Sequence, residues 1–277
     1  MQKHHIFFNE AGYHNHIVHG LLTLYSLGAP KEAIEQHYKH NTSYQSKLSE
    51  ARKDISEDMK SPEQFKKFLG KGKYYSEFLS FFKKEMADKG WENVLNEFLF
   101  SGDERAEDLL GRVFAGTFNQ TEIYAALLNQ KGFFHPFIHL GFGVEFKQPA
   151  IIAEALAQAA VHDDWMSSYL FTTERESTAS STKTMPDLLD EIRKDAKLSN
   201  AAEWDDANKV RDGILKRAPG EMINYAKQWT VSEADIEQKT AEIINATIYF
   251  TAAAQRPPKQ ACNPFSFSNV PTFKIWD

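Results

Sequence analysis

The chain has 277 residues, a net charge of −6 at pH 7 and a pI near 6.0. This charge argues against nucleic-acid binding, because such proteins carry a basic patch or stripe. The single cysteine, Cys262, excludes an intramolecular disulfide and fits a reducing compartment, so we expect a cytoplasmic protein. No apolar run reaches 18 residues and no secretory signal opens the sequence, so no membrane association is expected.

Helical periodicity dominates the sequence from its first elements onward. Apolar residues at steps of three and four, from Ile17 to Leu27, predict a helix over 14–27 that ends at Gly28. The same reasoning predicts helices over 74–88, 91–99, 104–115, 149–169 and 232–254. Alternation of period two never lasts more than a few residues. The predicted fold class is therefore all-α, an irregular multi-helix bundle around a histidine-rich interior.

The domain organisation is predicted as one helical domain over residues 1–256. The Ser/Thr-rich segment 172–184 is expected to be an exposed, mobile loop that covers a pocket. Residues 257–277 contain prolines and aromatic residues without a period, which indicates an irregular tail. The helix over 232–254 carries a wider apolar set than a surface helix needs, which predicts an uncovered apolar patch.

Six of the ten histidines stand in three compact groups, and their spacing points to a metal site. His16 and His19 are three residues apart, and His135 and His139 are four apart. On a helix, the two members of each pair would lie on one face. Two helices that each offer two imidazoles to a common interior can hold a metal. The predicted metal ligands are His16, His19, His135, His139 and His162.

The catalytic candidates are the remaining histidine of the first group, His14, and two acids, Glu145 and Glu154. Glu154, Gln158 and His162 are spaced by four and share a helix face, and a ligating imidazole needs a partner for its second nitrogen. A purely structural role, in which buried histidines bond to backbone or carboxylate, remains the alternative for all of these histidines.

Other cofactor motifs are missing from the sequence. The stretch LGFGVEF places Phe146 where the third glycine of a dinucleotide fingerprint belongs, so it predicts neither a flavin site nor a Rossmann site. Phosphate-binding loops, H-E-x-x-H and C-x-x-C are also missing from the sequence.

Three stretches carry a resemblance to a known family: HNHIVHGLLTLYSLGAP, RVFAG with HPFIHLGFGVEF, and QPAIIAEALAQAAVH. Together they resemble the questin oxidase-like family of fungal secondary metabolism, over roughly residues 10 to 256. The resemblance implies a Baeyer–Villiger-type oxidoreductase that uses dioxygen to oxidise or cleave the anthraquinone or anthrone ring of an aromatic polyketide. It further implies NADPH as reductant and histidine-bound iron.

Two departures from the family pattern leave alternatives open. Residues 117–132 stand where the family passes almost directly between two motifs, and 257–277 replace a region expected to supply at least one more histidine and a candidate lysine ligand. We therefore expect a truncated, weakly active chain. One alternative is an inactive truncated paralogue that binds an aromatic ligand or a partner. A weaker one is a metal-dependent hydrolase with Glu145 or Glu154 as base.

Overall fold

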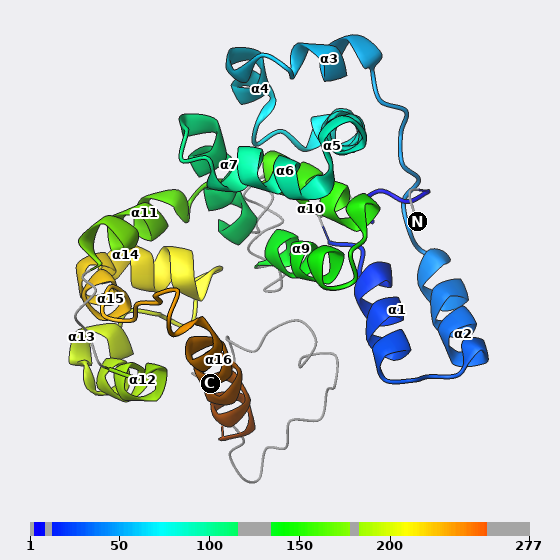
Figure 1. Ribbon diagram of the computed structural model, residues 1–277. Helices are drawn as coiled ribbons and strands as arrows, with labels where there is room; N and C mark the ends of the chain where they lie inside the picture. The colour runs from blue at the N-terminus through cyan, green and yellow to red at the C-terminus, as the bar shows by residue number, and fades with distance from the viewer. Residues whose placement is uncertain (1–2, 9–12, 116–133, 178–182, 254–277) are drawn as a thin grey trace. The chain divides into compact units, whose positions relative to one another are not determined.

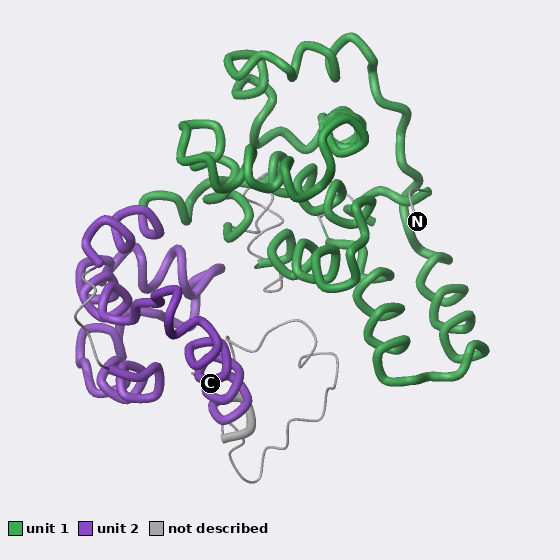
Figure 2. The backbone as a smooth tube through the Cα atoms, viewed as in Figure 1, with its two compact units in different colours: residues 1–168 green, residues 169–277 purple. Residues whose placement is uncertain are grey.

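The computed structural model describes residues 3–8, 13–115, 134–177 and 183–253 (Figure 1). These residues form helices joined by loops, with two isolated β-bridges, so the all-α prediction is confirmed for this part of the chain. The chain divides into two compact units, residues 1–168 and 169–277 (Figure 2). The boundary at Ser168 lies inside the single domain predicted over 1–256. Within the described ranges, each helix is too short or too polar to cross a membrane.

The first unit is built around one long aromatic core and a central helix. Its elements are α1 (Ile17–Ser26), α2 (Lys31–Thr42), α3 (Lys53–Asp58), α4 (Pro62–Phe68), the 3₁₀ turn η1 (Gly72–Tyr74), α5 (Tyr75–Lys89), α6 (Trp91–Leu95), the π-helical turn η2 (Asn96–Phe100), α7 (Glu104–Ala115), α9 (His135–Glu145) and α10 (Pro149–Val161).

Helix α10 is buried along its whole length from Ile151 to Val161. Its small and apolar side chains let α5, α7 and α9 pack directly against it (Figure 1). Helices α9 and α10 approach closely at Gly143, where an added Cβ would lie 2.9 Å from the backbone nitrogen of Ile152. Because α10 has no solvent face, the polar side chains it carries must be satisfied inside the protein.

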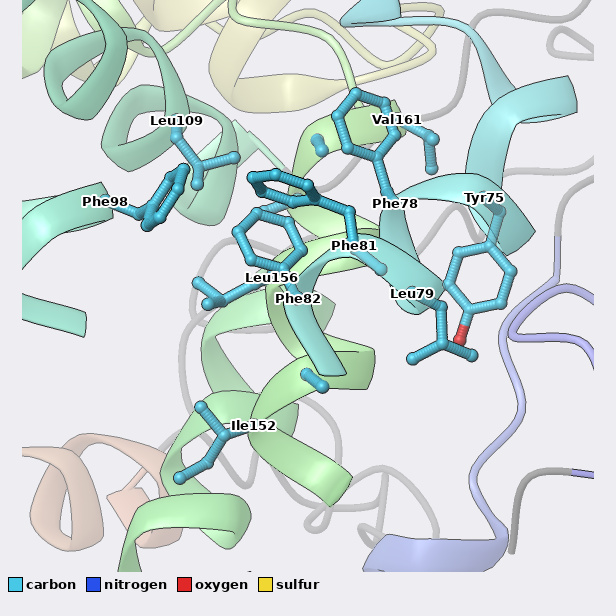
Figure 3. Packing of buried hydrophobic residues seen from close by; sticks show 14 of the residues in the cluster. Tyr75, Phe78, Leu79, Phe81, Phe82, Phe98, Leu109, Ile152, Leu156 and Val161 are labelled. Atoms are coloured by element: carbon cyan, nitrogen blue, oxygen red, sulfur yellow. The ribbon is translucent and has the colours of Figure 1, made fainter. Parts of the chain in front are cut away.

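The aromatic core packs on the side of α10 that faces α5 (Figure 3). Phe65 and Phe78 meet edge to face with centroids 5.2 Å apart, and Phe82 and Phe98 do so at 5.3 Å. All four are fully buried. Burial of one such side chain contributes about 1.5–3 kcal/mol, so these rings are a main source of stability for the first unit.

The helix predicted over 149–169 is interrupted in the structure. α10 ends at Val161, since His162 is extended (ψ 166°) and its carbonyl accepts a hydrogen bond from the Arg112 guanidinium. A separate helix, α11 (Ser167–Glu176), follows. The break has a tertiary cause, because Arg112 lies 50 residues away in the sequence.

Other predicted boundaries shift for local reasons. The helix predicted over 14–27 begins only at Ile17, because Phe7 and His14 form a β-bridge before it. The segment 91–99 divides into α6 and the π-helical η2. The loop predicted over 172–184 is helical as far as Glu176. Residues 178–182 lie outside the described residues, as do the insertion 117–132 and the tail 257–277.

The second unit has a much smaller core than the first. Its elements after α11 are α12 (Met185–Lys194), α13 (Ala196–Ser199), the π-helical turn η3 (Lys209–Ile214), α14 (Leu215–Arg217), α15 (Pro219–Ala226) and α16 (Ile236–Ala253). Leu198, Ala201 and Ala218 form its buried centre. The uncovered apolar patch predicted for the last helix stays a prediction, because residues 254–277 lie outside the described residues; within α16, Ile244 is 52% exposed and Ile248 62% exposed.

The close contact between α9 and α10 predicts opposite effects for two glycines of α9. Gly143→Ala should lower the free energy of unfolding by about 1–3 kcal/mol, because its Cβ meets Ile152. Gly141→Ala meets nothing within 4 Å and should raise the same quantity by about 0.5–1 kcal/mol through helix propensity. Urea unfolding of both variants measures the difference. Equal effects of the two substitutions would contradict the packing described.

Candidate metal centre

Six histidines from three separate segments converge in the first unit. His14 and His16 precede α1, His19 lies on α1, His135 and His139 lie on α9, and His162 follows α10. The ring centroid of His135 lies 4.2 Å from that of His14 and 4.8 Å from those of His16 and His19. The convergence predicted from the histidine spacing is therefore observed.

Helices α1 and α9 both begin at this cluster. His16 is the N-cap of α1, and His135 is the first residue of α9. The start of α9 is set by Phe134 in a left-handed conformation (φ 58°) and by Pro136 in the first turn. His16 stands just outside its helix, yet its ring still lies 5.5 Å from that of His19.

Three of the histidines could hold one metal ion. One ring nitrogen each from His16, His19 and His135 lies within 4.8 Å of the other two. Metal–nitrogen bonds of about 2.1 Å place ligand nitrogens roughly 3–4 Å apart, so small ring movements would close this triad on an ion. We name these three residues the histidine triad.

The nitrogens of the triad show that a metal fits. His19 Nδ1 and His135 Nε2 are buried without a hydrogen-bond partner among the described residues. The opposite nitrogen of each ring is held: His135 Nδ1–H can donate to Gln158 Oε1, 3.1 Å away, and His19 Nε2–H can donate to His139 Nδ1, 3.1 Å away. A buried unsatisfied nitrogen costs about 1–3 kcal/mol, which a bound ion would remove. Ligating imidazoles are normally oriented in this way through their second nitrogen.

Glu154 supports the triad through His139 rather than by touching it. Its carboxylate lies 3.1 Å from His139 Nε2, so both nitrogens of His139 are engaged, one with Glu154 and one with His19. Burial and the Glu154 charge raise the pKa of the neighbouring Tyr75 well above its ordinary value. A cavity of about 20 Å³ between Tyr75, His139 and Glu154 has room for one water.

His14 and His162 form a second buried pair beside the triad. Their Nε2 atoms are 3.0 Å apart, and the ring of His14 stacks on His135 at an interplanar angle of 15°. His162 Nδ1 is a further buried nitrogen without a partner among the described residues. Glu145, in contrast, lies exposed at the end of α9, and the structure does not bring it to the histidines.

Two supporting residues were not among the candidate site residues. Gln158, which contacts His135, could have been found from the sequence, because it is spaced by four from Glu154 and from His162 and so shares their helix face. Arg112 donates a hydrogen bond to the carbonyl of His162, and no pattern in the sequence pointed to this contact. Gly70 lies beside Arg112, and an added Cβ there would lie 3.1 Å from Arg112 Nη1.

Burial keeps the imidazoles uncharged. Desolvation, together with the nearby His139, lowers the pKa of His16 to about 4. Desolvation and the Arg112 charge lower the pKa of His162 to about 3. Desolvation, followed by neighbouring imidazoles, also lowers the pKa values of His14, His19 and His135 well below the ordinary value. These rings are therefore neutral at pH 7, the form that binds metals.

Fold and site together define an all-α protein with a buried histidine centre. Residues 13–272 match the questin oxidase-like family, and the chain belongs to this family. It is 37% identical over 267 residues to Baeyer–Villiger oxidase AgnL3 of Paecilomyces divaricatus, covering 94% of this chain and 55% of that protein.

Two further relatives are similarly distant. Questin oxidase of Aspergillus terreus is 36% identical over 262 residues, covering 93% of this chain and 55% of the relative. Oxidoreductase AflY of Aspergillus parasiticus is 34% identical over 264 residues, covering 93% and 50%. The chain thus spans about half the length of these relatives.

The buried neutral histidines predict a stability that depends on pH. Their pKa values are lower in the folded chain than the unfolded value of about 6.5, so between pH 6.5 and about 4 the unfolded chain binds more protons. The contribution of these neutral histidines to the free energy of unfolding is therefore fully present above pH 6.5 and is lost as the pH falls. Each such histidine contributes a slope of about 1.4 kcal/mol per pH unit. Urea unfolding with a chelator, at pH 7.5, 6.5 and 5.5, measures this slope, and a flat profile below pH 6.5 would contradict it.

Gln158→Met should weaken metal binding while the fold persists. Methionine has similar length but cannot hold His135 Nδ1, and loss of such a partner costs about 10–100-fold in metal affinity. Leu156→Met, on the same buried helix, is the matched control and should bind metal as the unmodified protein does. Titration with Co²⁺, followed by its visible absorption, measures both affinities. Equal affinities would show that Gln158 does not orient a ligand.

Proposed function

We propose that the protein is an oxidoreductase that uses dioxygen to oxidise or cleave the ring of an aromatic polyketide of the anthraquinone or anthrone type. The observation that carries this proposal is the histidine triad, with two buried nitrogens left without partners among the described residues. Family membership supports it, because the relatives carry the names Baeyer–Villiger oxidase and questin oxidase.

The proposed metal is iron, held by His16, His19 and His135. Dioxygen reacts slowly with closed-shell organic molecules, and a histidine-bound iron supplies the single electrons that overcome this barrier. The protein's own contribution is to keep the three imidazoles neutral and oriented. Gln158 orients His135, and Glu154 orients His19 through His139.

NADPH as reductant and a cytoplasmic location complete the proposal. NADPH rests on the family resemblance, and we assign no residues to it. The location rests on the single cysteine, Cys262, which fits a reducing compartment. The proposals on NADPH and on location can be tested separately from the metal site, because iron binding can be measured without a reductant.

The geometry favours an oxidase over a metal-dependent hydrolase. A hydrolase needs a carboxylate base beside the metal-bound water. Glu154 is engaged with His139, behind the triad, and Glu145 is exposed at the end of α9. A paralogue that binds a ligand without turnover is the second candidate, and oxygen consumption distinguishes it from an oxidase.

Iron loading and oxygen consumption test the proposal together. The purified chain should bind about one Fe²⁺ per molecule under anaerobic conditions, and His135→Gln should reduce this binding at least about tenfold. His40→Gln, an exposed histidine on α2, is the control and should not change it. The iron-loaded protein, given NADPH and an anthraquinone, should consume dioxygen. Iron binding without consumption would favour the inactive paralogue, and failure to bind iron would overturn the metal site.

A further inference from the structure

Tyr75, at the start of α5, is a buried tyrosine whose hydroxyl has no hydrogen-bond partner among the described residues. Its side chain is 1% exposed and stands at one side of the aromatic core, apart from the phenylalanine rings (Figure 3). Because burial and the Glu154 charge raise the pKa of Tyr75 well above its ordinary value, the hydroxyl keeps its proton and can donate it to an acceptor. A buried hydroxyl without a partner is unfavourable, so an acceptor is expected beside it.

The small cavity beside Tyr75 brings together three polar groups that lack partners among the described residues. His4 of the N-terminal segment, Tyr75 and Glu154 all line this cavity of about 20 Å³. One oxygen of Glu154 bonds to His139, and the other makes no hydrogen bond to a described residue. His4 Nδ1 is buried without a partner, and desolvation lowers the pKa of this histidine, so the neutral ring can accept a hydrogen bond there. A buried water typically makes about three hydrogen bonds, so one water in this cavity could accept from Tyr75 and donate to Glu154 and His4.

The Glu154 carboxylate begins a chain of hydrogen bonds that ends at the triad. A carboxylate only accepts, so His139 Nε2 carries the proton that it donates to Glu154, 3.1 Å away. His139 Nδ1 is then an acceptor, and it takes the Nε2 proton of His19 at 3.1 Å. The lone pair of His19 therefore lies on Nδ1, the nitrogen that is buried without a partner among the described residues. The orientation of Glu154 thus decides which nitrogen His19 offers to a metal.

We propose that Tyr75 is a positioning residue of the histidine triad. Through one water held in the cavity, its hydroxyl fixes the Glu154 carboxylate and thereby the nitrogen that His19 offers to a metal. This inference rests on the proposed function for the role of the triad in an oxidase. The hydrogen-bond chain itself requires no metal, reductant or turnover, so it can be measured on the metal-free chain.

NMR of the metal-free chain with ¹⁵N-labelled histidine tests the proposal. The buried Nε2 proton that His139 donates to Glu154 should give a separate imidazole resonance, identified by its loss in His139→Gln. Tyr75→Phe removes one oxygen atom and keeps the ring, so it should shift this resonance and speed the exchange of its proton with solvent. It should also weaken Co²⁺ binding about 2- to 10-fold, less than the loss of about 10- to 100-fold that is typical for a group in direct contact with a ligand.

Tyr74→Phe is the matched control for this experiment. Tyr74 is the adjacent tyrosine, is half-buried against Phe68, and does not line the cavity. Its substitution should leave both the resonance and the Co²⁺ affinity unchanged. His4→Leu removes another partner of the water and should shift the same resonance, which keeps the test decisive if Tyr75→Phe unfolds.

An unchanged resonance in folded Tyr75→Phe, or in His4→Leu where Tyr75→Phe unfolds, would overturn the inference. Equal shifts in the two tyrosine variants would also overturn it, because they would show an effect of packing alone. A shifted resonance in a chain that binds no metal would overturn the proposed function and leave the hydrogen-bond chain in place.

Discussion

Neutral imidazoles buried around one point are the constraint on which the first unit depends. A buried imidazole that stays neutral needs a partner for each of its two nitrogens, because one nitrogen is a hydrogen-bond donor and the other an acceptor. On one side of the cluster these partners come from three residues: His139 bonds to His19, Gln158 to His135, and Glu154 to His139. Two nitrogens, His19 Nδ1 and His135 Nε2, are left without a partner among the described residues, and a bound metal would satisfy them without requiring a charged imidazole.

Helix α10 makes this arrangement possible. Its alanines and small apolar residues let it be buried on all sides, so Glu154 and Gln158 can emerge directly into the cluster from its one polar face. Two glycines remove side chains where neighbours approach: Gly143 beside Ile152 and Gly70 beside Arg112. Arg112 in turn ends the helix at His162 and fixes the histidine that meets His14. Packing, helix termination and site geometry are therefore parts of one structure.

Much of this could be predicted from periodicity and spacing. The all-α class followed from apolar steps of three and four, and the meeting of the two histidine pairs followed from their spacing next to apolar helices, although His16 lies just before α1 and not on it. What could not be predicted depends on contacts between distant residues. The break after α10 depends on a hydrogen bond from Arg112 to the carbonyl of His162. His139 contacts Glu154 whereas His135 contacts Gln158, and this difference appears only in the folded structure. Glu145, near the same helices in sequence, is exposed because it ends α9.

X-ray absorption of the Fe²⁺-loaded chain tests the central claim most directly, because it reports the atoms bound to the metal without requiring activity. The account predicts a first shell that contains three imidazole nitrogens at about 2.1 Å, with the multiple-scattering pattern of histidine rings. His19→Gln should remove one of them, since His19 belongs to the triad. His162→Gln should leave the three in place. A first shell of oxygen atoms alone, or one that loses an imidazole with His162 but not with His19, would contradict the assignment of the metal to the histidine triad.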